Sequence, residues 1–205
     1  MKKLFSLLTT SLALVLLSNF GPASPGYQVG DKVADFRLKN VDGRLVSLAG
    51  NQAAKGYIVV FTCNTCPYAK AYESRIIALH QKYAPQGYPV VAINPNDEAT
   101  VPGDSFAEMQ ARAASKKYPF AYLQDETQQV AKTFGATRTP HLYVVTRQGP
   151  DFVVSYIGAI DDNSEDAKLV KTRYVEQAMT DILTGKPAAI SSTKAIGCTI
   201  KWKKA

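Results

Sequence analysis

Cysteine, histidine and tryptophan are scarce in this sequence, with three, two and one among 205 residues. Three cysteines are too few to hold together a small disulfide-dense domain, and a chain of this length can bury a core without them. Charged residues make up 20% and hydrophobic residues 46%, which excludes disordered and fibrous classes. The formal net charge is +7, but no arginine-rich stripe predicts a nucleic-acid partner. What remains is a globular domain of mixed helices and strands.

The first 23 residues are typical of a secretory signal peptide. Lys2 and Lys3 precede an apolar run from 4 to 17, which is shorter than the roughly 20 residues that a membrane-spanning helix needs. Small residues and Pro22 then lead to a predicted cleavage after Ala23. We therefore expect a periplasmic or secreted protein, with an uncleaved N-terminal anchor as the alternative.

Hydrophobic patterning predicts strands alternating with helices over residues 24–188. The turn at Asp42-Gly43 predicts a β-hairpin, and the continuous apolar run 57–62 predicts a strand buried on both faces. A helical stripe between this run and the apolar run 88–94 predicts a right-handed parallel crossover. Further elements are expected after a cap at Asp104 or Ser105, then at 126–134, 142–146, 152–157 and 165–184.

The last residues, 189–205, form a basic tail that we expect to be extended and packed on the domain. Ile196, Cys198, Ile200 and Trp202 alternate with polar or small residues, so an extended tail would direct Cys198 with the apolar set. This predicts a packed structural thiol rather than a reactive one. A role as a third redox partner is the alternative.

Cys63 and Cys66 lie where the buried strand 57–62 ends and an amphipathic helix begins. Residues three apart on a helix are close enough for a disulfide. Backbone N–H groups and the helix dipole at such a position favour a thiolate. We therefore predict that Cys63 is the nucleophile and Cys66 the resolving thiol of a reversible disulfide. Half of a zinc site and an inert structural disulfide are the alternatives.

Two further side chains, His141 and Glu73, are candidates to act on this pair. His141 follows Pro140 and could lower the pKa of Cys63 as an imidazolium, although a surface hydrogen bond is the simpler expectation. His80 lies off the apolar helix stripe and is expected to face solvent. Glu73, one turn beyond Ala69, could act on Cys66, but a solvated position is the simpler expectation.

The strand–Cys-x-x-Cys–helix order, followed by Thr139-Pro140 before a late strand, resembles the thioredoxin-like superfamily. The segment 29–36 and the Asp42-Gly43 turn resemble its exported redoxin branch, the AhpC/TSA and TlpA/ResA-like proteins. The resemblance implies a three-layer α/β fold with a central mixed β-sheet, an N-terminal β-hairpin and a helical insertion. It also implies a cis peptide at Pro140 beside the cysteines, and backbone groups of Thr139 that bind a polypeptide substrate.

The sequence departs from this family pattern at several positions. Thr62 replaces a frequent tryptophan, Tyr57 replaces the buried acid of thioredoxins, and Ala69 stands where TlpA/ResA-like reductases often have glutamate. The acid that would deprotonate Cys66 is therefore not identified. Val60 replaces the threonine or serine that the peroxiredoxin signature requires three residues before its cysteine.

These observations predict an exported thiol–disulfide oxidoreductase that acts on protein disulfides or dithiols, more readily as a reductase. The alternatives are a thiol peroxidase and a copper-carrying module, because soft thiolates suit copper(I). We expect no cofactor, no resident metal and no nucleic-acid partner. We expect a membrane-bound or soluble thiol to supply the electrons. We also expect the protein to be a monomer.

Overall fold

The computed structural model describes residues 26–204, so the predicted signal peptide lies outside the described residues. Eight strands form one mixed sheet in the order β1-β9-β8-β4-β5-β6-β2-β3, and β10 pairs separately with β7. Within residues 26–204, no helix combines the length and apolar character that crossing a membrane requires. The strands are β1 (Lys32–Val33), β2 (Leu38–Asn40), β3 (Leu45–Val46), β4 (Gly56–Phe61), β5 (Val90–Asn94), β6 (Ala121–Gln124), β7 (Arg138–Thr139), β8 (His141–Gln148), β9 (Asp151–Gly158) and β10 (Cys198–Thr199).

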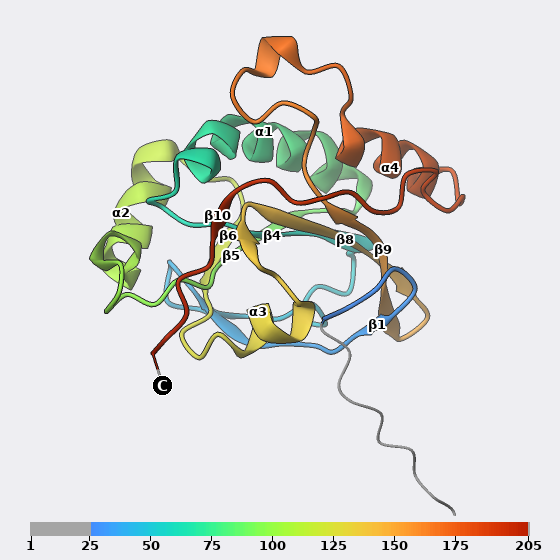
Figure 1. Cartoon of the computed structure of the whole chain (residues 1–205). Helices are drawn as coiled ribbons and strands as arrows, with labels where there is room; N and C mark the ends of the chain where they lie inside the picture. Colours follow the sequence, from blue (N-terminus) through green and yellow to red (C-terminus); the bar gives the residue numbers. More distant parts are fainter. Residues whose placement is uncertain (1–25, 205) are drawn as a thin grey trace, which may run out of the picture.

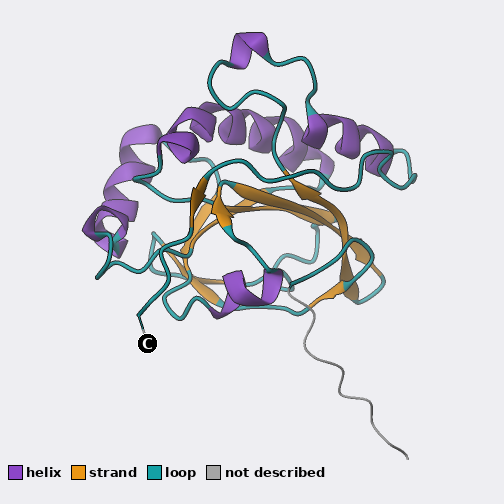
Figure 2. Cartoon of the chain, viewed as in Figure 1, coloured by secondary structure: helices purple, strands orange, loops and turns teal. Residues whose placement is uncertain are grey.

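Helices cover both faces of this sheet (Figures 1 and 2). Helices α1 and α4 lie on one face and α3 lies on the other, while α2 flanks the sheet at the side of β6. The predicted three-layer thioredoxin-like fold is therefore confirmed, and α2 is its helical insertion between β5 and β6. The helices are α1 (Pro67–Tyr83), α2 (Phe106–Lys116), α3 (Gln129–Phe134) and α4 (Tyr174–Leu183).

Strand β4 is the centre of the core, and all six of its residues are buried. Its side chains alternate between the two faces. Tyr57, Val59 and Phe61 pack with the α3 side, whereas Ile58 and Val60 pack with α1 and α4. This double burial explains the unbroken apolar run in the sequence.

The predicted hairpin and the predicted parallel pairing of the strands before and after α1 are confirmed. Strands β2 and β3 pair antiparallel around the Asp42-Gly43 turn, with Leu38 opposite Val46. Strands β4 and β5 pair in parallel on either side of α1. Ser105, rather than Asp104, caps α2 by accepting a hydrogen bond from the Glu108 N–H.

The prediction of one helix over 165–184 is wrong, because α4 begins only at Tyr174. Side chains before it bond locally to the backbone and compete with a helix. The Asp166 carboxylate accepts from Lys168 N–H, and Asn163 Oδ1 accepts from the N–H groups of Glu165 and Asp166. The first part of the predicted helix is instead a loop containing a short 3-10 turn at Ala167–Leu169.

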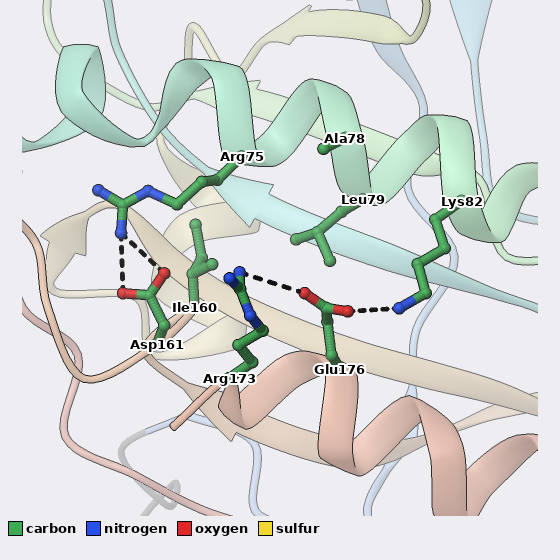
Figure 3. A pocket seen from close by; sticks show the side chains of 8 residues that line it. All are labelled: Arg75, Ala78, Leu79, Lys82, Ile160, Asp161, Arg173 and Glu176. Carbon is green, nitrogen blue, oxygen red and sulfur yellow. Dashed lines mark hydrogen bonds and ion pairs between the residues drawn. The ribbon is translucent and has the colours of Figure 1, made fainter. Parts of the chain in front are cut away.

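Ion pairs join α1 to the chain that leads into α4, across the pocket drawn in Figure 3. Arg75 Nη1 of α1 donates to both Asp161 carboxylate oxygens, at 2.9 and 2.7 Å. Lys82 of α1 pairs with Glu176 of α4, which also pairs with Arg173. The residues that line this pocket include none of the cysteines.

Candidate active site

The Cys63–Cys66 motif lies in the loop between β4 and α1, as the sequence predicts. Cys66 is the N-cap of α1, and Pro67 is the first helical residue. Cys63 stands before the helix, so the pair is brought together by the loop rather than by helical spacing. Both side chains are buried, each with about 4% of its surface exposed.

Asp104 holds this loop in place from the turn before α2. Its Oδ1 accepts hydrogen bonds from the backbone N–H groups of Asn64 and Thr65, at 2.7 and 3.2 Å. Its Oδ2 accepts from the Thr65 hydroxyl and from Asn96 Nδ2, both at 2.8 Å. Asp104 is only 1% exposed, so its charge is compensated by donors rather than by water.

Asn64 connects the same loop to the insertion and to strand β6. Its Nδ2 donates to the Gly103 carbonyl at 3.0 Å, and its Oδ1 accepts from the hydroxyl of Tyr122 at 2.9 Å. Both middle residues of the motif are thus fixed by polar contacts. The cysteines therefore project from a loop whose backbone is held by other elements.

Thr139 and Pro140 lie against the cysteine pair because β4 and β8 run antiparallel, with Phe61 opposite His141. The Thr139–Pro140 peptide is cis, as the family resemblance implies. Thr139 Oγ1 lies 3.2 Å from Cys63 Sγ, and the Thr139 carbonyl oxygen lies 3.1 Å from Cys66 Sγ. The hydroxyl contact to Cys63 was not predicted from the sequence, which pointed only to backbone groups.

Cys66 and Cys198 form a disulfide in the structure, with their Cα atoms 6.0 Å apart, and Cys63 is the free thiol. The expectation that Cys198 is a packed structural thiol is therefore wrong. Strand β10 pairs with β7 and brings Cys198 opposite Thr139, so the tail reaches the cysteine pair. This pairing joins residues separated by about 60 positions, which alternation within the tail does not indicate.

The expected low pKa of Cys63 is also corrected by the structure. Burial raises the pKa of the Cys63 thiol, and the nearby negative charge of Asp104 raises it further. Hydrogen bonds from the Thr139 hydroxyl and from the backbone N–H groups of Cys66 and Thr65 act in the opposite direction but are outweighed. In this state Cys63 is a protected thiol, because only the thiolate is nucleophilic.

His141 does not supply an imidazolium to the sulfur pair. Burial, aided by the positive charge of Arg138, lowers the pKa of His141 to about 4, so the ring is neutral at pH 7. Its Nδ1 lies 3.4 Å from the backbone nitrogen of Thr137 and accepts its hydrogen bond. His80 is half-buried rather than solvent-facing, and its Nδ1 accepts from Val90 N–H.

The buried neutral His141 predicts a stability that falls in mild acid. Its pKa is about 4 in the folded protein and 6.5 in an unfolded chain, so the unfolded state binds more protons between these values. The free energy of unfolding should therefore fall by about 3 kcal/mol as the pH drops from 6.5 to 4. Denaturant titrations at several pH values measure this slope.

The matched control is His141→Asn, which keeps a hydrogen-bond acceptor near Thr137 but does not titrate. Its slope between pH 6.5 and 4 should be flatter than that of the wild type. His80, whose pKa burial also lowers, contributes equally to both proteins and cancels in the comparison. Equal slopes would contradict the prediction.

Glu73 is buried rather than solvated, which corrects the simpler expectation. Arg112 Nε donates to its carboxylate at 2.8 Å, the Tyr118 hydroxyl donates to the same oxygen, and Lys116 lies nearby. The carboxylate thus links α1 to α2.

At the position where thioredoxins have a buried acid, this chain has Tyr57. Its hydroxyl donates a hydrogen bond to the Leu48 carbonyl at 2.6 Å, so Tyr57 is engaged in the core.

Asp104 is the main site residue that the sequence reasoning missed. An acid just before Ser105 suggested a helix cap, and nothing local distinguishes that role from a contact with a loop 40 residues away.

Over residues 26–204, no group of three or more histidine, cysteine, aspartate or glutamate side chains is placed to hold a metal ion.

Comparison with known proteins identifies the family. The AhpC/TSA family model matches residues 29–155, more than half of the chain. The chain belongs to the AhpC/TSA family. Among curated proteins, no sequence match was found.

Solved structures share the fold of this chain. An uncharacterized conserved protein from Geobacillus kaustophilus is 35% identical, with a TM-score of 0.80 over 87% of this chain and 94% of its own. A hypothetical protein from Sinorhizobium meliloti 1021 is 31% identical, with a TM-score of 0.80 over 88% and 97%. A thiol:disulfide interchange protein of the thioredoxin family from Chlorobium tepidum shares the fold at 20% identity, with a TM-score of 0.51 over 67% and 87%.

Proposed function

We propose that this AhpC/TSA protein is an exported thiol–disulfide oxidoreductase in which Cys63 attacks a substrate disulfide and Cys66 resolves the mixed disulfide. The observation that carries the proposal is the meeting of a free thiol and a disulfide at one loop, since Cys63 lies beside a Cys66 that is already bonded. Thiol–disulfide exchange needs a thiol and a disulfide within reach. Export is supported by the basic and apolar pattern of residues 1–23.

The reaction starts from the reduced protein, in which a thiol donor has cleaved the Cys66–Cys198 disulfide and left Cys66 free. The Cys63 thiolate attacks one sulfur of the substrate disulfide, forms a mixed disulfide and releases the other substrate sulfur as a thiolate. The Cys66 thiolate then attacks Cys63 Sγ, which releases the second substrate thiolate and leaves a Cys63–Cys66 disulfide. Two electrons pass from the protein to the substrate, and a thiol donor must return them.

Thr139 and Pro140 are proposed to position the substrate chain. Thr139 lies on β7 next to both cysteines, and β10 pairs with this strand in the structure. An extended polypeptide would take the place of β10 on this edge by β-strand addition, which would bring its disulfide to Cys63. We propose that reduction of protein disulfides is the physiological direction.

The test is turnover of insulin disulfides by the full mature chain with dithiothreitol as electron donor. Cys63→Ser should lower turnover by at least about 100-fold, because it removes the thiol that attacks the substrate disulfide. Cys66→Ser should instead accumulate a mixed disulfide between Cys63 and insulin, found on the tryptic peptide 56–70. A circular-dichroism melt of each variant establishes that it is folded.

Three results would contradict the proposal. Unchanged turnover by a folded Cys63→Ser variant would remove Cys63 from the reaction. Rapid oxidation of the wild type by hydrogen peroxide, without insulin turnover, would favour a thiol peroxidase, and stoichiometric retention of copper(I) would favour a copper carrier.

A further inference from the structure

The C-terminal segment, residues 195–204, lies over the strand edge that the proposed substrate would use. It is the dark red end of the chain in Figure 1, which includes β10 and runs from there down to the C-terminus. Cys198 pairs antiparallel with Thr139, and Thr199 pairs with Arg138. Thr139 is thereby fully buried. The segment thus occupies the position of a bound extended peptide.

Several contacts fix the register of this segment. Ile200 N–H donates to the Thr137 carbonyl at 3.2 Å, and the Ile200 side chain is buried in the core next to α3. Gln128 holds the chain after it, donating to the Lys201 carbonyl and accepting from Lys203 N–H. The buried side chain and these bonds hold Cys198 at one place along the edge.

Gly197 permits the close approach that brings Cys198 to Cys66. A Cβ atom at Gly197 would lie 2.3 Å from the Thr139 carbonyl oxygen and 2.9 Å from the Pro140 nitrogen, both backbone atoms. The Gly197 carbonyl accepts from Arg138 Nη1 at 2.8 Å. A side chain at position 197 would therefore force the segment away from the cysteines.

Thr139 lies next to all three cysteines. Its hydroxyl contacts Cys63 Sγ, its carbonyl oxygen contacts Cys66 Sγ, and its backbone pairs with Cys198. The three cysteines also pack in one apolar cluster with Ala69. Cys63 is therefore next to the Cys66–Cys198 bond and is the only free thiol among the described residues.

We propose that Cys198 is a third redox cysteine, which replaces Cys63 as the disulfide partner of Cys66. This inference rests on the proposed function of the Cys63–Cys66 pair. The Cys198 thiolate attacks Cys66 Sγ of the Cys63–Cys66 disulfide, the bond between Cys63 and Cys66 breaks, and Cys63 leaves as a thiolate that takes up a proton. One disulfide is exchanged for another, so no external oxidant or reductant is consumed.

The anchored segment favours the Cys66–Cys198 bond as the product that accumulates. A tethered partner reacts as if it were present at a high effective concentration, and the contacts of Ile200 and Gln128 hold the tether at the site. The released Cys63 is then a buried thiol, protonated near neutral pH because burial and Asp104 raise its pKa. The two oxidising equivalents are stored at Cys66–Cys198, away from the attacking sulfur.

The exchange can be followed by mapping disulfides after oxidation of the reduced full chain with oxidised glutathione. Samples are quenched with acid at successive times, alkylated and digested with trypsin. Cys63 and Cys66 fall on peptide 56–70, and Cys198 falls on peptide 195–201. A Cys63–Cys66 bond stays within one peptide, whereas a Cys66–Cys198 bond joins two peptides and leaves Cys63 alkylated.

We expect the bond within peptide 56–70 to form first and then to decay as the joined peptides accumulate. In Cys63→Ser the joined peptides should form more than about tenfold more slowly, since the Cys63–Cys66 disulfide that Cys198 attacks cannot form. Gly197→Ala keeps all three sulfurs but displaces the segment, so the bond within peptide 56–70 should persist. Gly50→Ala is the matched glycine control, because Gly50 has no positive φ and its Cβ would meet only the Ser47 hydroxyl at 3.2 Å and the Ser47 carbonyl at 3.5 Å, so this variant should behave as the wild type.

The relay is overturned if the bond within peptide 56–70 is the stable end product in the wild type. It is also overturned if Cys63→Ser joins the two peptides as fast as the wild type does. Neither result depends on insulin. If the protein turns over insulin but gives one of these two results, the proposed function is retained and the relay is overturned. If the protein does not turn over insulin but the disulfides form in the expected order, the proposed function is overturned and the exchange among the three cysteines is retained.

Discussion

Asp104→Ala should lower the free energy of unfolding by about 3 kcal/mol or more, because each hydrogen bond to a charged group is worth about 1.5–3 kcal/mol. The substitution leaves four donors without their acceptor: the N–H groups of Asn64 and Thr65, the Thr65 hydroxyl and Asn96 Nδ2. At 1% exposure, water cannot replace the carboxylate without rearrangement of the loop. Urea denaturation of the variant and the wild type measures the difference.

Asp104→Asn separates the charge of this residue from its contacts. The amide retains an oxygen for the loop N–H groups but removes the negative charge that raises the pKa of Cys63. The pKa of Cys63 should therefore fall, and its alkylation by iodoacetamide at pH 7–8 should become faster than in the wild type. In both proteins the rate should rise with pH, since only the thiolate reacts.

The control for this variant is Asp151→Asn, which removes a carboxylate at the opposite end of β8 and β9. Asp151 pairs with Lys32 at the surface, and its loss should leave Cys63 alkylation unchanged. The same alkylation rate in Asp104→Asn and the wild type would show that Asp104 does not control the Cys63 thiol.

Asp161→Ala should lower the free energy of unfolding by about 3–5 kcal/mol, because it leaves the buried Arg75 without its counter-charge. The two side chains are 10% and 2% exposed. Asp161 also accepts from the Tyr72 hydroxyl at 2.9 Å, and the Arg75 guanidinium stacks on the Tyr72 ring. Figure 3 shows the carboxylate directly facing the guanidinium of α1.

Thermal and urea unfolding test this prediction against Lys32→Ala. That substitution breaks the surface pair of Lys32 with Asp151 and should leave the stability nearly unchanged, since exposed pairs contribute little. A loss in Asp161→Ala no larger than that in Lys32→Ala would mean that Arg75 finds another partner. Asp162 is the carboxylate nearest in sequence that could serve.

Much of the fold follows from local sequence patterns. The unbroken apolar run in β4, the turn at Asp42-Gly43 and the helical stripe after Cys66 each fix an element through burial or turn geometry that acts over a few residues. The same reasoning failed for residues 165–173. There, Asn163 and Asp166 bond to nearby backbone N–H groups, and this local competition delays the start of the helix until Tyr174.

Local sequence patterns are enough to place Cys63 and Cys66 at a strand–helix junction and Thr139-Pro140 before a strand. The partner of Cys66, the protection of Cys63 and the role of Asp104 become visible in the folded chain alone. Helical and strand periodicity arise between neighbours in the sequence, whereas disulfide pairing and burial depend on which distant segments meet. The β10–β7 pairing, which joins the chain end to the cysteine pair, has no local signature at either strand.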